Sequence, residues 1–111
     1  MEEKFSIQPY LNDLHLLNET VKQIQKDFSF FSVEITFSGN KNTAYDELLS
    51  QIQPVIKKLA DEDYQKLLSL LYRVDINEEQ LKTAGEITRH ISDLVIKRCL
   101  QKVVLRKLFS K

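Results

Sequence analysis

The apolar positions near the start of the chain follow the repeat of an amphipathic helix. They fall alternately three and four residues apart, at Leu14, Leu17, Val21, Ile24 and Phe28. This spacing places them on one face of an α-helix. Pro9 suits the first turn, because proline lacks an N–H group that would be unpaired there in any case. The pattern predicts a helix from Pro9 to about Asp27.

The repeat shortens to two between residues 31 and 38. Four apolar residues alternate there with four polar ones, namely Phe31, Val33, Ile35 and Phe37 against Ser32, Glu34, Thr36 and Ser38. Because the apolar members are β-branched or aromatic, the alternation predicts one short, half-buried strand. A strand has backbone donors and acceptors that need a partner. We expect this partner to be Phe5-Ser6-Ile7, giving a two-stranded ribbon, or the same strand of a second copy, giving a homodimer.

The next apolar stripe predicts a helix that begins near residue 43. Its members are Leu48, Leu49, Ile52, Val55, Ile56 and Leu59. Thr43 and Asp46 have the spacing of a capping box at its start. Pro54 lies inside the stripe and is expected to kink or split the helix, because it lacks an N–H and clashes with the carbonyl four residues earlier.

Two further helices complete the pattern. The acidic run at residues 61–63 stands where the positive end of a helix dipole prefers negative charge, and it predicts a helix over residues 64–74. Asp75 or Asn77 would then cap a short turn. Residues 86–109 are predicted to form the longest helix of the chain.

The composition removes several classes of function. The 111 residues contain two glycines and one cysteine. Glycine-rich loops that cradle phosphates need several closely spaced glycines, and a disulfide or a multi-thiolate zinc site needs more than one thiol. We interpret Cys99 as a buried structural thiol. Since no nucleophile, base and orienting group stand at a recognisable spacing, we expect no catalytic residues, no metal, no cofactor and no small-molecule ligand.

The net charge of zero conceals an uneven distribution. Residues 1–85 hold 9 Lys or Arg and 14 Asp or Glu, a balance of −5, whereas residues 86–111 hold 7 and 2, a balance of +5. We interpret the asymmetry as a basic helix packed on the acidic remainder of the fold. The alternative is a basic surface for nucleic acid or an acidic partner, formed by Arg89, Lys97, Lys102, Arg106, Lys107 and Lys111.

One basic residue of the last helix falls on its apolar side. On a helical wheel Arg98 lies within the arc formed by Ile87, Ile91, Leu94, Leu105 and Phe109. A charge in such a position needs a partner, since a desolvated and unpaired charge is strongly unfavourable. We predict that Arg98 forms an ion pair with an acid at the preceding helix junction, Asp75 first and Glu78 second. Alternatively, the side chain of Arg98 extends to solvent.

Two stretches of the second half carry a resemblance to known sequences. They are LLYRVDINE at residues 70–78 and IKRCLQKVVLR at residues 96–106. Together they resemble a group of short, mostly helical, uncharacterised proteins of Bacteroidetes-type bacteria. The likeness covers mainly the C-terminal part, roughly the last forty residues. It implies a bacterial, cytoplasmic, helical protein and implies no activity.

These patterns predict one compact domain over residues 1–111, mainly α, with four to five helices and one short strand or two-stranded ribbon near residues 31–38. The acidic start and the lack of a long apolar run favour a cytoplasmic protein that does not enter a membrane. We expect a non-enzymatic protein–protein interaction module, whose partner is another protein or a second copy in a homodimer. The alternative is a nucleic-acid-associated accessory protein that uses the basic C-terminal helix.

Overall fold

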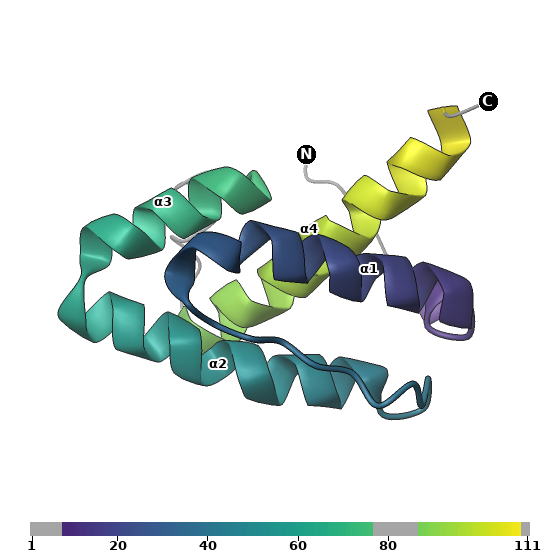
Figure 1. Ribbon diagram of the computed structural model, residues 1–111, viewed down its shortest axis with the longest axis horizontal. Coiled ribbons are helices and arrows are strands. Elements are labelled where there is room, and N and C mark those ends of the chain that lie inside the picture. The colour runs from purple at the N-terminus through teal and green to yellow at the C-terminus, as the bar shows by residue number, and fades with distance from the viewer. Residues whose placement is uncertain (1–7, 77–86, 110–111) are drawn as a thin grey trace.

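Four α-helices make up most of residues 8–76 and 87–109, which are the residues that the computed structural model describes. They are α1 (Leu14–Asp27), α2 (Ala44–Glu62), α3 (Tyr64–Val74) and α4 (Ile87–Phe109), with short 3₁₀ turns at η1 (Gln8–Tyr10) and η2 (Ser29–Phe31). In Figure 1, α2 and α3 form an antiparallel hairpin, and α4 crosses behind α1 so that its end extends beyond the other helices. The prediction of a mainly helical fold is confirmed.

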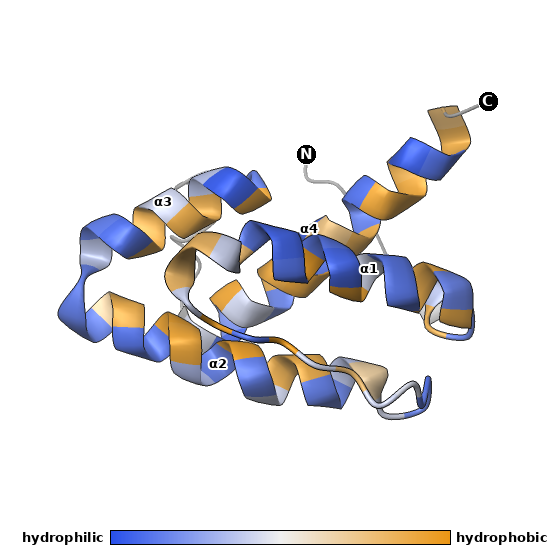
Figure 2. Ribbon diagram, in the orientation of Figure 1, coloured by the Kyte–Doolittle hydropathy of each residue, from blue (hydrophilic) through white to orange (hydrophobic). Residues whose placement is uncertain are grey.

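The core lies between α4 and the other three helices. Figure 2 shows apolar and polar residues in alternating bands along the helices, as expected when each helix turns one face inward. The middle of α4 is covered on more than one side, because it packs against both α1 and α2. Its buried residues are Ile91, Val95, Ile96, Cys99, Leu100, Val103 and Val104.

This burial corrects the predicted apolar arc of the last helix. Ile91 is buried and Leu94 is half-buried, but Leu105 and Phe109 are exposed. A single arc is the wrong description, because a central helix has neighbours around much of its circumference, whereas the last two turns of α4 lie outside the bundle (Figure 1).

The strand predicted near residues 31–38 is not formed, and the described residues contain no strand. The chain is extended there and runs between α1 and α2 (Figure 1). The alternation correctly places Ile35 in the core, at 1% exposure. Phe5-Ser6-Ile7, the expected ribbon partner, lies outside the described residues.

Side chains of the flanking helices replace the missing strand partner. Gln51 on α2 accepts from the N–H of Thr36 and donates to its carbonyl, both at 2.8 Å. Glu47 accepts from the N–H of Ser38 at 2.9 Å, and Gln25 on α1 donates to the carbonyl of Ile35 at 2.7 Å. Since α2 side chains already occupy the edge at Thr36 and Ser38, that edge is not open to a strand from a second copy.

The helix starts differ from the predictions in two places. Pro9 lies in η1 and not in α1, which begins at Leu14 because the carboxylate of Asp13 accepts from the N–H of Leu16 at 3.1 Å. Thr43 stands at the N-cap of α2, but its hydroxyl donates to Glu47 at 2.6 Å and caps no backbone N–H. The predicted capping box with Asp46 is therefore not formed.

Helix α2 continues through Pro54 without being split. The carbonyl that loses its partner belongs to Ser50, and both residues are exposed, so water can bind that carbonyl. Asp63 caps α3 by accepting from the N–H of Lys66 at 3.2 Å. Asp75 ends α3 in the left-handed conformation, with φ 78°, and the turn predicted after it lies outside the described residues. The alternative cap Asn77 lies outside the described residues.

Candidate functional site

A polar cluster lies where α1, α3 and α4 meet, and it is buried at Gln23, Asp27 and Cys99 and exposed at Arg106. Its members are Gln23, Asp27, Cys99, Lys102 and Arg106. Asp27 ends α1 and carries the charge at the centre: its carboxylate lies 2.8 Å from the ammonium of Lys102 and accepts from the amide of Gln23 at 3.1 Å. Arg106 extends the cluster by donating to the side-chain oxygen of Gln23 at 2.9 Å.

The chain brings these groups together because α1 and α4 pack against each other. Lys102 also donates to the backbone carbonyl of Arg73 near the end of α3, at 3.3 Å, so its ammonium joins three helices. The sequence reasoning did not single out Asp27. One signal was available in the sequence: Asp27 stands in the last turn of a predicted helix. The negative end of the helix dipole disfavours an acid there, so a nearby cation is expected.

Cys99 is enclosed by this cluster. Its thiol is fully buried and donates to the carboxylate of Asp27 over 3.5 Å. Burial, followed by the negative charge of Asp27, raises the pKa of Cys99 far above its usual range. The sulfur is therefore held as a neutral thiol, which is a poor nucleophile. No group of three or more possible metal ligands occurs among the described residues.

The structure brings Arg98 and Asp75 together. Their side chains form an ion pair at 2.6 Å, and the same guanidinium donates to Gln101, also at 2.6 Å. Asp75 is exposed and Arg98 is half-buried, so solvent screens this pair. Glu78, the second predicted acid, lies outside the described residues.

The described residues of the proposed basic surface have different surroundings. Lys102 and Arg106 belong to the polar cluster, and Lys97 pairs with Asp93 at 3.0 Å on its own helix. Arg89 and Lys107 are exposed near opposite ends of α4. Lys111 lies outside the described residues. The cations of α4 are thus largely engaged within the fold.

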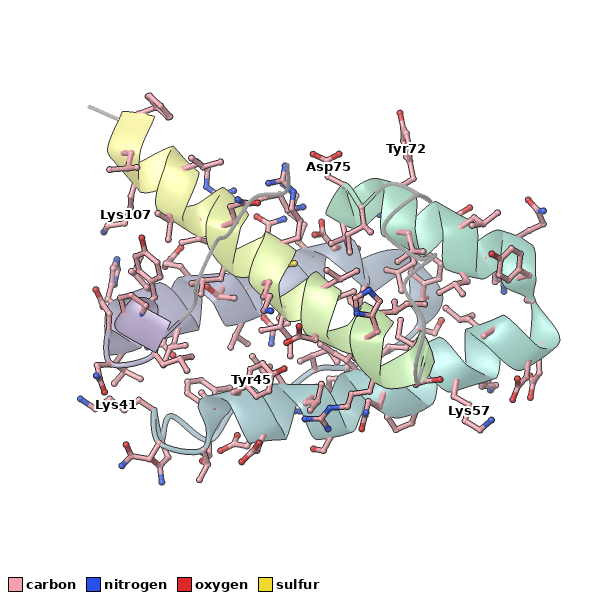
Figure 3. All side chains as sticks on the ribbon, turned by 180° about the vertical axis from the view of Figure 1, so that it is seen from behind. Lys41, Tyr45, Lys57, Tyr72, Asp75 and Lys107 are labelled. Atoms are coloured by element: carbon pink, nitrogen blue, oxygen red, sulfur yellow. The ribbon has the colours of Figure 1, made fainter. Side chains whose placement is uncertain are left out.

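A second polar contact joins α2 to α4. The phenol of Tyr45 points toward α4 (Figure 3) and donates to the carboxylate of Asp93. Burial and this hydrogen bond together raise the pKa of Tyr45 well above its usual range. The phenol stays protonated at neutral pH, and the contact is a structural link between the helices.

Exposed aromatic side chains lie on α3 and on the turn η2 beside it. Phe30, Tyr64 and Tyr72 are 72%, 54% and 86% exposed, and Tyr72 points away from the molecule (Figure 3). With the half-buried Leu68 they form what we call the aromatic surface. The guanidinium carbon of Arg73 lies 4.0 Å from the centre of the Phe30 ring, a cation–π contact.

A hollow of about 540 Å³ lies within this surface. Phe30, Leu68 and Tyr72 contribute apolar walls, and Lys66 and Arg73 contribute positive charge. A second hollow of about 540 Å³ shares the Phe30 wall and reaches Glu62 and Asp63 at the corner between α2 and α3. Lys58 and Lys66 line this second hollow as well, so acidic and basic side chains are mixed there, whereas the charged residues of the first hollow are basic.

A smaller apolar row lies on the free end of α4. Leu105, Leu108 and Phe109 are exposed there, and Figure 2 shows the apolar band at the helix end. The row lines neither of the two hollows. It is a single helix face, whereas the aromatic surface combines a helix, a turn and two hollows.

Comparison with known proteins gave no match: no family model fits the chain, and no curated protein or solved structure is significantly similar to it. None of the helices in residues 8–76 and 87–109 is both long enough and apolar enough to cross a membrane. The functional interpretation accordingly rests on the geometry of the sites described above.

Proposed function

We propose that this protein is a non-enzymatic protein-interaction module and that the aromatic surface is its contact site. The observation that carries the proposal is the exposure of Phe30 on η2 and of Tyr72 on α3, which line the same hollow. Aromatic residues and arginine are the types enriched at the centres of protein interfaces. The position of Phe30 and Tyr72 at one hollow supports a binding role more strongly than scattered apolar exposure would.

The polar residues favour this proposal over a nucleic-acid accessory role. Nucleic-acid binding depends on many cations that are free to contact phosphates. Lys97 and Lys102 are instead engaged by Asp93 and Asp27, and Arg106 by Gln23.

Site-specific photo-crosslinking tests the proposal. A photoreactive phenylalanine analogue replaces Tyr72 in the full chain, and a matched control carries it at Lys57, an exposed residue on α2. We expect a discrete protein adduct in host cells at position 72 and none at position 57. The captured protein, identified and purified, should bind the wild-type chain and not the Tyr72→Asp variant.

Either of two results would overturn the assignment. One is the absence of any adduct at position 72, and the other is an adduct that forms equally well at position 57. Binding of the purified captured protein to Tyr72→Asp with unchanged affinity would show that the contact lies elsewhere.

A further inference from the structure

We infer that the aromatic surface binds an acidic segment of a partner protein, with an apolar side chain of that segment in the first hollow and its carboxylates beside Lys66 and Arg73. This inference rests on the proposed function and adds the chemistry of the partner. The first hollow is the one walled by Phe30, Leu68 and Tyr72. Its apolar walls favour an apolar side chain, and the charges around them select what stands beside that side chain.

The two charged residues that line the first hollow are both cations without an anion. Neither Lys66 nor Arg73 forms an ion pair with another described residue. Asp75, the acid nearest to Arg73 in the sequence, is already paired with Arg98 at 2.6 Å. Carboxylates of a partner would complement these two cations, which the described part of the fold leaves unpaired.

The contact with Phe30 holds the Arg73 side chain at the edge of the hollow. Its guanidinium carbon lies over the ring, 4.0 Å from the centre. None of its N–H groups donates to a described residue, since the contact of Arg73 with Lys102 uses the backbone carbonyl. A guanidinium held in this way is available to bind a carboxylate through two parallel hydrogen bonds.

The order of groups along α3 indicates what the segment carries. Lys66 and Arg73 are seven residues apart, which is about 10.5 Å of helix at 1.5 Å rise per residue. Leu68 and Tyr72 stand between them in the sequence and form the apolar walls. A segment with an acid on each side of an apolar residue matches this order of charge, apolar wall and charge.

The acids beside the second hollow favour such a segment over nucleic acid. Aromatic rings and cations together can also bind single-stranded nucleic acid. Lys66, however, shares the second hollow with Glu62 and Asp63. A phosphate chain that continues past Lys66 would meet these two carboxylates, whereas a short acidic segment can end before them.

A peptide-display selection tests this chemistry. The full chain is the bait for a library of random short peptides, and the Lys66→Gln, Arg73→Gln double variant is the bait in a parallel selection. We expect the wild-type chain alone to enrich peptides with an acid on each side of an apolar residue. Replacing both acids of an enriched peptide by their amides should weaken its binding to the wild-type chain about tenfold or more.

Fluorescence anisotropy with one enriched peptide then measures the contribution of each residue. Arg73→Gln should weaken binding about tenfold and Lys66→Gln about threefold, since a lysine makes a single exposed contact. Tyr72→Ser should weaken it about tenfold or more. Lys107→Gln is the matched control, because it removes the same charge from an exposed position on α4 and should leave binding unchanged. Circular dichroism checks that each variant is folded, and the amide peptide carries the test if one is not.

Several results would overturn the inference. They are a selection that enriches no peptide on the wild-type chain, enriched peptides without acids, or a peptide that binds Arg73→Gln as tightly as the wild-type chain. A single-stranded oligonucleotide that binds the wild-type chain more tightly than the peptide and displaces it would assign the surface to nucleic acid instead. An adduct at position 72 together with enriched peptides that lack acids would reject the acidic segment and keep the interaction module. A missing adduct would reject the module itself.

Discussion

The ion pair between Asp27 and Lys102 should be the most sensitive polar contact of the fold. Their side chains are 7% and 19% exposed and lie 2.8 Å apart. Replacing Lys102 by methionine keeps most of the side-chain volume but leaves the carboxylate buried without its cation. Removal of one partner of a buried pair costs about 3–5 kcal/mol. Because Gln23 still donates to Asp27, we expect the lower end, a loss of about 3 kcal/mol in the free energy of unfolding.

Removing the charges of Asp27 and Lys102 together should reduce stability by much less than the sum of the two single losses. In the Asp27→Asn, Lys102→Met double variant no charge remains unpaired, and an amide at position 27 can still accept from Gln23. We expect the double variant to recover about 2 kcal/mol relative to the sum of the two single losses. Asp27→Asn alone should have a smaller effect than Lys102→Met, since Lys102 can still donate to the carbonyl of Arg73.

Urea unfolding followed by far-UV circular dichroism measures these differences, provided that the dependence on urea is the same for all variants. The expected loss for Lys102→Met corresponds to a fall in Tm of roughly 10 °C. Lys57→Met is the control, because its pair with Asp61 spans 3.1 Å but the two side chains are 69% and 60% exposed. That change should stay within about 0.5 kcal/mol. If Lys102→Met is no more harmful than Lys57→Met, the argument from burial is refuted.

Three further predictions concern other contacts. Burial raises the pKa of Cys99, so the neutral thiol contributes fully to stability below the unfolded-chain pKa of about 8.5, and this contribution is lost as pH rises. Between pH 8 and 10 the free energy of unfolding should fall by up to about 1.4 kcal/mol per pH unit. Urea titrations of Cys99→Ala should no longer show this slope. Gln51→Leu removes both partners of the Thr36 backbone and should reduce stability by about 1–2 kcal/mol, with faster hydrogen exchange at the Thr36 amide; unchanged exchange would contradict the contact. Asp75→Asn tolerates the left-handed conformation and should change stability by less than about 1 kcal/mol, whereas Asp75→Val should be more harmful by thermal unfolding; equal effects would show that the ion pair with Arg98 matters more than the backbone.

The helices were predictable because their apolar periodicity reports directly on burial. The stripe over residues 14–28 and the acidic residues before Tyr64 located α1 and α3 closely. The errors lie at helix ends. Both Pro9 and Asp13 are residue types that commonly stand at a helix N-terminus. Helix α1 begins after Asp13 because its carboxylate accepts from a backbone N–H of the first turn, and this contact depends on the tertiary structure.

The extended segment shows what alternation can and cannot report. A period of two correctly placed Ile35 in the core, because any extended chain points alternate side chains to opposite sides. It could not identify the backbone partners. Those are Gln25, Glu47 and Gln51, whose amide and carboxylate groups do the work of a neighbouring strand from helical positions.

The polar cluster could not be located from sequence spacing. Asp27 is separated from Cys99 by 72 positions and from Lys102 by 75, and only the packing of α1 on α4 makes them neighbours. The pair of Arg98 with Asp75 was within reach, since Asp75 is an acid at the junction that precedes α4. Arg98 could be singled out because it interrupts a predicted apolar arc, whereas nothing in the sequence around Lys102 distinguishes it from an exposed lysine.

The charge asymmetry of the chain does not indicate the surface that we propose as functional. Two cations of the basic α4 reach Asp27 and Asp75 in the acidic part of the chain, so the asymmetry is largely used to hold α4 against the rest of the fold. The aromatic surface has no comparable signal in the sequence. Tyr64, Leu68 and Tyr72 have helical spacing, which equally predicts a buried face, and α3 buries Leu67, Leu71 and Val74 instead. The neighbouring helices of this bundle cover the row with Leu67, Leu71 and Val74 and leave Tyr64 and Tyr72 exposed, which is why we propose the exposed side as the contact site.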